Sequence, residues 1–266
     1  LGQHFLINEE VPEIMTKSLE LVAGDTIIEV GPGHGELTQA IVAAINAGNL
    51  KDTKIVAIEK DPLLAEEVRQ RFKDKPFFEV IEADILEFLY SPEGKKLAKG
   101  NYKMVGNLPY YITGHLLRII SELKERPAIA IFMVQKEVAE RMAAPPPDMN
   151  RLSASVQFWA EPQLLVKVPK EEFDPPPEVD SAVILLRLRE SAKGQDGTIF
   201  YETVRQVFAQ PRKTIFNNLR KAFADRNLSE EASLQLLKDI DIDPKARPQD
   251  LSLEKILTLA DKIAKS

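Results

Sequence analysis

Short apolar runs alternate with amphipathic stretches of helical period through most of the chain, and this alternation restricts the fold more than any other feature. Thr26 to Val30 has the apolar character of a buried strand, and Glu36 to Ala47 has the periodicity of a helix. A second strand and helix are expected at Lys54 to Ile58 and Pro62 to Phe72. Such alternation predicts an α/β fold, with a mostly parallel sheet covered by helices.

Further apolar runs extend this sheet. Three strands are expected at Phe77 to Ile81, Tyr102 to Val105 and Ala128 to Val134. Gln163 to Val168 and Ser181 to Leu188 then follow each other with no long helix between them, although a proline-rich link separates them. We expect these last two runs to pair as a hairpin that closes one edge of the sheet.

The composition changes after Arg189. Residues 191–197 are small and polar, as in a linker. Only helical periodicity follows, in four stretches: Phe200 to Ala209, Thr214 to Ala224, Ser229 to Asp239 and Ser252 to Lys265. The sequence therefore predicts a large α/β domain over residues 1–190, a linker over 191–197 and a small all-helical C-terminal domain over 198–266.

Composition excludes several classes of site. Lys and Arg number 35 against 41 Asp and Glu, a net charge of −6, so a polyanionic partner must be bound by a local basic patch. Without cysteine there is no disulfide, thiolate zinc site or cysteine nucleophile. His4, His34 and His115 lie far apart in the sequence, which disfavours a histidine metal site. We therefore expect no bound metal.

Nothing in the sequence indicates export or a membrane. No apolar run reaches the length needed to span a bilayer, and residues 1–6 lack the cationic head of a signal peptide. The chain starts without Met, so its numbering is expected to begin inside the native chain. We expect a cytoplasmic protein with no membrane partner.

Glycines at alternate positions predict a ligand-binding loop between the first strand and its helix. Gly31, Gly33 and Gly35 permit positive φ and close approach of a ligand to the backbone, and the loop opens onto a helix N-terminus. A dinucleotide-binding loop would need a further glycine at the position of Glu36. Glu29, just before the loop, suits a ligand with a cationic amino group better than a pyrophosphate.

Acidic residues follow the next two strands, at the edge where open α/β sheets bind ligands. Glu59 is placed to accept hydrogen bonds from ribose hydroxyls, and Asp84, with Ile85 beside it, to accept from an adenine amino group. Taken alone, these features describe a turn and two solvated strand ends. Together, at three successive strand ends, they predict a site for S-adenosylmethionine, which joins a nucleoside to an amino acid.

The fourth strand ends in a second candidate motif, Asn107-Leu108-Pro109-Tyr110. An adenine amine is a poor nucleophile because its lone pair is delocalised into the ring. Two acceptors, the Asn107 side-chain oxygen and the Leu108 carbonyl, would favour a pyramidal nitrogen whose lone pair faces a methyl donor, while Pro109 restricts the backbone. Tyr110 would stack on the flipped base. The alternative is a proline turn whose tyrosine packs on the core.

Five segments, in this order and spacing, resemble a single family. They are residues 1–6, Glu29 to Thr38, Asn107 to Tyr110, Phe173 to Ser181 and Arg212 to Thr214. Over essentially its whole length, the chain resembles the KsgA-type small-subunit ribosomal RNA adenine dimethyltransferases.

The resemblance implies a seven-stranded Rossmann-like sheet of the class I methyltransferases, followed by a small helical domain. It implies transfer of four methyl groups from S-adenosylmethionine, with S-adenosylhomocysteine as product, to N6 of two adjacent adenosines near the 3′ end of small-subunit (16S) rRNA. The substrate would be a pre-ribosomal particle in late small-subunit biogenesis, and the enzyme would be a monomer.

The resemblance also assigns residues by position. Those implied to contact the donor are His4, Leu6, Gly31, Glu59, Asp84 and Asn107. Phe173 is implied to stack on the target adenine opposite Tyr110, whereas Phe173 considered alone would be a core aromatic that anchors a proline-rich loop. His4 stands where the family usually has Asn, which changes the shape and protonation of this contact.

A local basic cluster provides the patch that RNA binding requires in an acidic chain. Its cations are Arg205, Arg212, Lys213, Arg220, Lys221 and Arg226. Since Asp225 is the only acid in this stretch, we expect the first five to contact RNA phosphates. Phe208, Phe216 and Phe223 recur here at helical spacing and are expected in the core of the helical domain. Further cations expected to extend this surface beside the active-site mouth are Arg118, Lys136, Arg141 and Arg151.

Other functions fit parts of the same pattern. A large-subunit rRNA adenine methyltransferase of the macrolide-resistance type would share the donor loop and the Asn107 motif, but residues 210–214 and Asn217 to Leu219 resemble the small-subunit type. A largely non-catalytic ribosome-assembly or RNA-binding factor would share the fold, but the intact Asn107 motif argues against lost chemistry. A nicotinamide dehydrogenase is disfavoured by Glu36.

Overall fold

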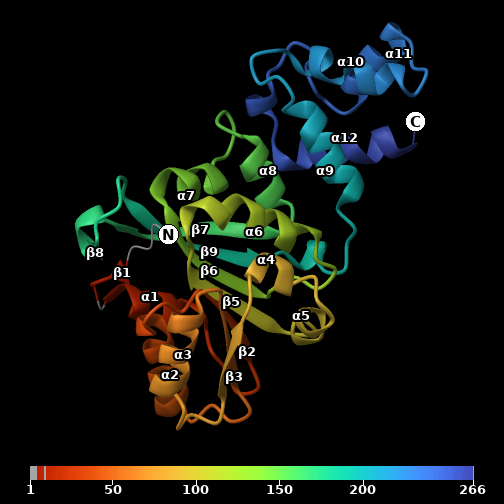
Figure 1. The fold of residues 1–266 in the computed structure, drawn as a ribbon. Coiled ribbons are helices and arrows are strands. Elements are labelled where there is room, and N and C mark those ends of the chain that lie inside the picture. Colours follow the sequence, from red (N-terminus) through yellow and green to blue (C-terminus); the bar gives the residue numbers. More distant parts are fainter. Residues whose placement is uncertain (1–4, 9, 266) are drawn as a thin grey trace.

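A seven-stranded sheet forms the centre of the protein in a computed structural model, which describes residues 5–8 and 10–265 (Figure 1). The order of its strands is β4-β3-β2-β5-β6-β9-β7. The strands of the described chain are β1 (Phe5–Leu6), β2 (Thr26–Val30), β3 (Lys54–Glu59), β4 (Phe78–Glu82), β5 (Tyr102–Asn107), β6 (Ile129–Gln135), β7 (Ala160–Val168), β8 (Phe173–Asp174) and β9 (Ser181–Leu188).

Helices connect most of these strands and continue beyond them. Between the strands lie α1 (Glu10–Ser18), α2 (Glu36–Gly48), α3 (Pro62–Arg71), α4 (Ile85–Phe88), α5 (Pro92–Leu97), α6 (Tyr110–Glu122), α7 (Lys136–Ala143) and α8 (Arg151–Gln157). After the last strand come α9 (Thr198–Val207), α10 (Ile215–Ala224), α11 (Glu230–Asp239) and α12 (Leu253–Lys265). No helix in the described part of the chain is both long and apolar enough to cross a membrane.

Pairing within the sheet confirms the predicted α/β class. β2 pairs in parallel with β3 and β5, β3 with β4, and β5 with β6. β9 runs antiparallel to both β6 and β7. The predicted hairpin is therefore confirmed, and β7 is its edge strand. The carboxyl ends of the parallel strands all meet at one edge of the sheet, where ligands bind in such folds.

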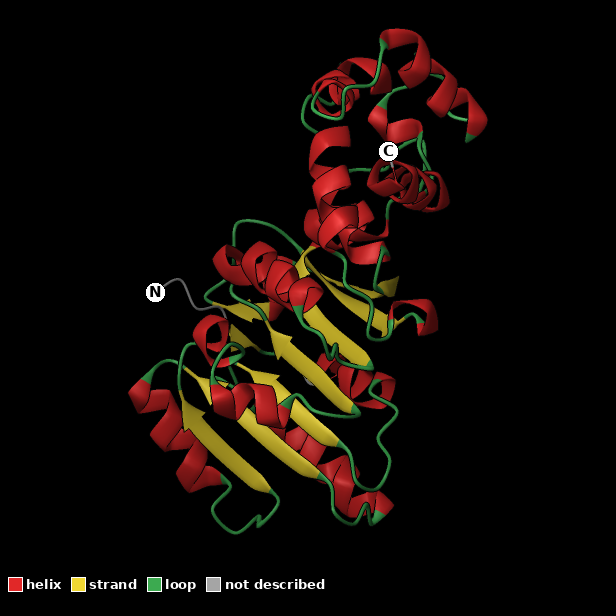
Figure 2. Ribbon diagram, turned by 90° about the vertical axis from the view of Figure 1, so that its right-hand side faces the viewer, coloured by secondary structure: helices red, strands yellow, loops and turns green. Residues whose placement is uncertain are grey.

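The sheet is buried on both faces, which explains the nearly continuous apolar runs of its central strands. Alternate residues of a strand face opposite sides. In β2, the fully buried Ile27 packs in a cluster with residues of α1, α2 and α3. Its neighbour Ile28 belongs to a second cluster, which contains residues of α4, α6 and α8. Figure 2 shows the helices on the two sides of the sheet.

The C-terminal helices α9 to α12 stand together beyond one end of the sheet (Figure 2). Phe200 of α9 stacks on Phe158, which follows α8, with the ring centroids 4.4 Å apart. The buried Arg126 donates hydrogen bonds to the carbonyl oxygens of Ala192 and Gln195, at 2.8 and 3.2 Å. The segment predicted as a linker is thus hydrogen-bonded to the α/β part of the molecule.

Two short strands lie outside the main sheet and are not predicted from the sequence. β1 pairs antiparallel with β8, so that Leu6 lies opposite Phe173. Two-residue strands are too short to have a detectable period, and only the folded chain brings these segments together. Helix α6 is also unpredicted, because it begins at Tyr110, directly after the proline that the sequence presents as a turn.

Candidate active site

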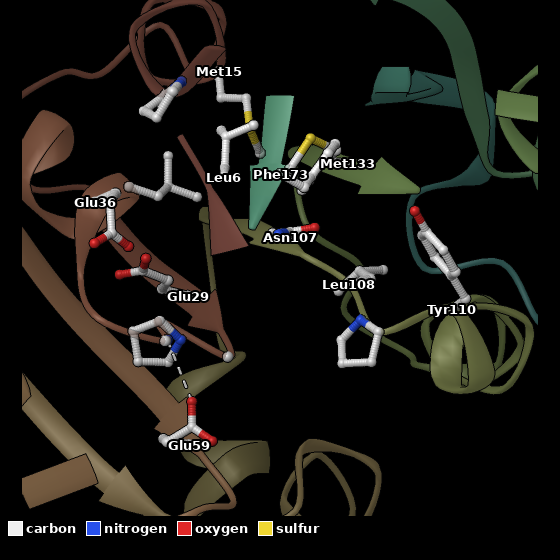
Figure 3. A pocket seen from close by; sticks show the side chains of 16 residues that line it. Leu6, Met15, Glu29, Glu36, Glu59, Asn107, Leu108, Tyr110, Met133 and Phe173 are labelled. Carbon is white, nitrogen blue, oxygen red and sulfur yellow. Dashed lines mark hydrogen bonds between the residues drawn. The ribbon is translucent and has the colours of Figure 1, made fainter. Parts of the chain in front are cut away.

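The carboxyl ends of the neighbouring strands β3, β2 and β5 enclose a pocket of about 140 Å³ (Figure 3). Glu29 of β2 lies opposite Val105 of β5, so that Gly31 and Asn107, each two residues further on, reach the same end of the sheet. The residues that line the pocket are Leu6, Pro12, Met15, Glu29, Gly31, Pro32, Gly33, Glu36, Leu37, Glu59, Asn107, Leu108, Pro109, Tyr110, Met133 and Phe173. The glycine loop and Asn107 therefore line the same pocket.

The glycine loop has the backbone that its sequence requires. Gly31, Gly33 and Gly35 all have positive φ, at 63°, 59° and 94°. The Gly31 N–H donates to the carbonyl oxygen of Ile58 at 2.9 Å, which ties the loop to β3. Gly35 is the N-cap of α2 and does not line the pocket.

Glu29 is a buried carboxyl group with one oxygen still unsatisfied. Its side chain is 1% exposed, and Oε2 accepts a hydrogen bond from the Thr38 hydroxyl at 2.7 Å. Oε1 is buried without a hydrogen-bond partner, although Glu29 lines the pocket. The pKa of Glu29 is raised to about 7: burial is the largest cause and the charges of Glu36 and Glu59 add to it, while the hydrogen bond from Thr38 lowers the pKa. A cation in the pocket would satisfy Oε1.

The pocket is electrostatically negative. Glu29, Glu36 and Glu59 all line it, and none of its lining residues in the described chain is Lys or Arg. Figure 3 shows the three carboxylates on the side of the pocket formed by β2 and β3. Nevertheless, no group of three or more His, Asp or Glu side chains among residues 5–8 and 10–265 is arranged to hold a metal ion. The carboxylates of Glu29, Glu36 and Glu59 favour a ligand that carries positive charge.

Glu59 and Asp84 occupy successive strand ends but differ in access to the pocket. Glu59 is 5% exposed; its Oε1 accepts from the Lys60 and Asp61 N–H groups, and its Oε2 lies 3.4 Å from the Gly33 nitrogen (Figure 3). Asp84 accepts from the Leu86 N–H at 2.9 Å and from the Lys60 ammonium at 2.8 Å. Although burial raises the pKa of Asp84, these two hydrogen bonds lower it overall. Asp84 does not line the pocket, and the buried Ile85 does not either.

The Asn107 motif turns from β5 into α6 at the opposite side of the pocket. Pro109 is the N-cap residue of α6, and Tyr110 is its first residue. The Tyr110 hydroxyl lies 2.9 Å from the Ser181 hydroxyl at the start of β9. Gly106, which the sequence does not single out, lets β5 approach β2, since a Cβ there would lie 2.5 Å from the Val30 carbonyl oxygen.

Phe173 joins the pocket through the pairing of β8 with β1. It is 2% exposed and belongs to the apolar cluster on the α1–α2 face of the sheet. It lines the pocket together with Leu6. Figure 3 shows it apart from Tyr110, and the implied stacking of the two rings on opposite faces of one base stays a prediction. Its position also matches the alternative expectation of a core aromatic. His4, the other residue implied in this segment, lies outside the described residues.

Several lining residues are missed by sequence reasoning. They are Pro12, Met15, Pro32, Glu36, Leu37 and Met133. Met15 reaches the pocket from α1 and Met133 from β6, and both are buried core residues whose sequence pattern does not differ from that of other apolar positions. Glu36 could have been predicted as a lining residue, because it is an acid directly after the last glycine of the loop.

The predicted RNA-binding cations lie on the surface of the helical part. Arg212, Lys213, Arg220 and Lys221 are exposed and make no ion pair within the described chain. Arg205 is exposed as well, with its guanidinium 3.7 Å from the Glu202 carboxylate.

The other members of this stretch have internal roles. Arg226 donates to the backbone carbonyls of Ile263 and Ala222, which ties α10 to α12 rather than to a partner. Phe208 and Phe223 are buried, and Phe216 packs against the same cluster, so the expectation that these aromatics form core is confirmed.

The strand order and the glycine loop at the carboxyl edge are those of the class I methyltransferase fold. A family model described as ribosomal RNA adenine dimethylase matches residues 1–265. The ribosomal RNA small subunit methyltransferase A of Dehalococcoides mccartyi is 38% identical over 257 residues, 96% of this chain and 84% of its own length. The chain belongs to the ribosomal RNA adenine dimethylase family.

Solved structures share the fold over the whole chain. A dimethyladenosine transferase from Plasmodium falciparum superposes with a TM-score of 0.81, covering 98% of each chain at 23% identity. The 23S rRNA methyltransferase ErmE superposes with a TM-score of 0.73, covering 98% of this chain and 99% of its own, also at 23% identity. With this membership, the protein is an S-adenosylmethionine-dependent rRNA adenine methyltransferase.

Proposed function

We propose that the protein transfers methyl groups from S-adenosylmethionine to N6 of two adjacent adenosines near the 3′ end of small-subunit rRNA. The observation that carries the proposal is the pocket in which the glycine loop and Asn107 line opposite sides of one negative cavity. The small-subunit methyltransferase A of Dehalococcoides mccartyi, at 38% identity, supports this choice of subunit.

The donor site fits the residues that are present. The unsatisfied Oε1 of Glu29 is a suitable acceptor for the amino group of the donor, and Glu59 is a suitable acceptor for its ribose hydroxyls. Gly31 and Gly33 leave room for close contact with the backbone. Bound in this pocket, S-adenosylmethionine supplies a methyl group on a positively charged sulfur, which the surrounding carboxylates favour. Asp84, which lies outside the lining of the pocket, would accept a hydrogen bond from the amino group of the donor's adenine.

The acceptor site lies at the Asn107 motif. In the proposed mechanism the Asn107 side-chain oxygen and the Leu108 carbonyl accept hydrogen bonds from the two N–H groups of the target amine. This arrangement concentrates its lone pair toward the donor side of the pocket. Tyr110 and Phe173 would hold the extruded base by stacking, which is worth about 1–3 kcal/mol per base. As the amine lone pair forms the new N–C bond, the C–S bond breaks and S-adenosylhomocysteine leaves; the excess proton then passes from the acidic methylated ammonium to water. Orientation of the two reactants therefore carries the step without a strong general base.

RNA binding is assigned to the helical part. We propose residues 1–190 as the methyltransferase domain, 191–197 as the linker and 198–266 as the domain that contacts the ribosome. The exposed cations Arg205, Arg212, Lys213, Arg220 and Lys221 would neutralise phosphates there. The substrate proposed is a pre-ribosomal small-subunit particle, which the protein would bind as a monomer in the cytoplasm.

Methylation of isolated ribosomal particles tests this function. Wild-type protein with labelled S-adenosylmethionine is expected to dimethylate adenosines in undermethylated small-subunit particles and to leave large-subunit particles unlabelled. Asn107→Ala is expected to lower kcat by about 100-fold or more at saturating donor, because it removes an acceptor used in the transition state. Particle binding by this variant should stay within about twofold of the wild type.

The same assay separates the alternatives. Label in large-subunit particles alone would contradict the proposal and favour the macrolide-resistance type of activity. Particle binding without label from the wild type would identify an assembly factor instead of an enzyme. A melting temperature raised by S-adenosylhomocysteine but not by NAD would exclude a dehydrogenase.

A further inference from the structure

The glycine loop is held from its outer side by a helix that contributes nothing to the pocket. None of the residues of α3 lines the cavity. The last turn of this helix nevertheless lies against the loop. The Arg71 guanidinium donates a hydrogen bond to the His34 carbonyl oxygen, and it stands 3.8 Å from the Glu36 carboxylate. One turn earlier, the Glu67 carboxylate lies 2.9 Å from Nδ1 of His34.

The residue after the helix completes this contact. A Cβ at Gly35 would lie 2.8 Å from the Phe72 ring, so the ring fits directly against the loop backbone. Phe72 is 3% exposed and belongs to the core, and the Arg71 guanidinium lies 5.5 Å from the centroid of its ring. A planar guanidinium beside a fixed aromatic ring is already oriented for its hydrogen bonds. The buried Phe72 ring therefore restrains the Arg71 guanidinium in the orientation that contacts the loop.

We expect the contact of Arg71 with the glycine loop to affect the conformation of the loop more than the stability of the fold. Arg71 and Glu36 are each more than two-fifths exposed, and such exposed pairs stabilise a fold only weakly. His34 does not line the pocket, so Arg71 holds the His34 carbonyl on the side away from the ligand. The loop glycines on either side have positive φ and little intrinsic preference for one conformation. The Arg71 contact adds an external constraint to the hydrogen bonds of Gly31 and Gly33 that also hold this loop.

We propose that Arg71 is a positioning residue for the methyl donor: from outside the pocket it fixes residues 31–36 in the conformation that receives S-adenosylmethionine. The inference rests on the proposed function for the identity of the ligand. The hydrogen bond from Arg71 to the loop backbone is its structural basis.

Arg71→Met tests the inference, with Arg69→Met as the matched control. Arg69 lies on the same helix, is similarly exposed and forms its ion pair with Glu66, inside α3. By calorimetric titration, Arg71→Met is expected to bind S-adenosylhomocysteine about tenfold more weakly than the wild type, and Arg69→Met within twofold. In the methylation assay, KM for the donor should rise about tenfold while kcat at saturating donor stays within twofold. Arg71→Lys, which keeps the charge but not the fork, should give an intermediate affinity.

Hydrogen exchange of the ligand-free protein gives a second readout. The amides of residues 33–36 are expected to exchange at least fivefold faster in Arg71→Met than in Arg69→Met, with unchanged exchange in the central strands. Equal donor affinity in Arg71→Met and Arg69→Met, or equal loop exchange, would overturn the inference. Wild-type protein that binds no S-adenosylhomocysteine would instead refute the proposed function, and the exchange experiment would still decide whether Arg71 holds the loop.

Discussion

Glu29 is a buried acid whose proposed role in donor binding is opposed by the cost of burying its charge. Its carboxyl group is enclosed by the core, hydrogen-bonded through one oxygen to Thr38 and unsatisfied at the other. Burial opposes the charged form and raises its pKa to about 7. A cationic ligand beside Oε1 would favour the carboxylate and lower that pKa. Ligand binding and ionisation of Glu29 are therefore coupled.

Donor affinity is expected to depend on pH because of this coupling. Free protein has Glu29 mostly ionised at pH 8 and mostly protonated at pH 6, since its pKa is about 7. The bound state needs the carboxylate, so binding releases a proton and affinity rises with pH. Titration calorimetry with S-adenosylhomocysteine should give about tenfold weaker binding at pH 6 than at pH 8.

Glu29→Gln provides the control for this pH effect. The variant should bind S-adenosylhomocysteine weakly, with no change between pH 6 and pH 8. Because the pKa of Glu29 is raised on folding, ionisation opposes folding as pH rises above the unfolded value, so the variant should be at least as stable as the wild type at pH 8. Weak binding could then not be attributed to unfolding. A wild-type affinity that is flat across this range would show that Glu29 does not face the ligand charge.

At the level of elements, the site residues that can be predicted from the sequence are those at the ends of the parallel strands. Glu59 and Asn107 are recognisable because they end the apolar runs of β3 and β5, and Glu29 because it interrupts the run of β2 one residue before its end. Parallel strands bring these ends to one edge of the sheet. Phe173 and Leu6 reach the same pocket through the pairing of β8 with β1, which has no periodic signal. Contacts between distant loops depend on tertiary packing, and here only the family resemblance anticipated them.

Two glycines allow a comparison between a position that requires positive φ, at the start of α2, and an ordinary helical position, in α6. Gly35 caps α2 with φ of 94°, and a Cβ there would lie 2.8 Å from the Phe72 ring. Gly114 lies in the middle of α6, where a Cβ would meet nothing within 4 Å. Gly35→Ala is expected to destabilise the protein by about 1–3 kcal/mol, through backbone strain and the contact with the ring.

Gly114→Ala serves as the comparison, because it makes the same chemical change at a helical position without strain. It should stabilise the protein by about 0.5–1 kcal/mol by lowering the conformational freedom of the unfolded chain. Urea unfolding of both variants measures the two effects. Equal stability of the two variants would mean that the loop backbone is not constrained as described.

For the whole molecule, the net charge conceals a separation of charges. The pocket is lined by Glu29, Glu36 and Glu59, whereas four cations on the helical part are exposed and make no ion pair within the described chain: Arg212, Lys213, Arg220 and Lys221. A uniformly acidic surface would repel RNA, but a local basic face attracts phosphates while the negative pocket keeps its preference for a cationic donor. The composition alone gives only the net charge of the two regions together. Their separation follows from where the chain changes from α/β to all-helical structure.

Reversal of the charge of Lys213 and Lys221 tests whether the helical part binds RNA separately from the donor pocket. The double variant Lys213→Glu/Lys221→Glu should bind small-subunit rRNA on the order of tenfold more weakly at moderate salt. The slope of log affinity against log salt should fall by about 0.7–0.9 for each phosphate that the variant no longer neutralises. Lys95→Glu/Lys96→Glu makes the same charge change on α5, in the α/β part, and is the matched control.

Binding measurements over a salt series distinguish local contact from net charge. If only the total charge mattered, both double variants would lose affinity equally and with the same slope. If the helical surface contacts phosphates, only the Lys213 and Lys221 variant changes the slope, and neither variant alters affinity for S-adenosylhomocysteine, because all four lysines lie outside the pocket lining. Identical salt slopes for the two variants would therefore remove the helical domain from the RNA-binding surface and leave the edge of the α/β part to contact the RNA.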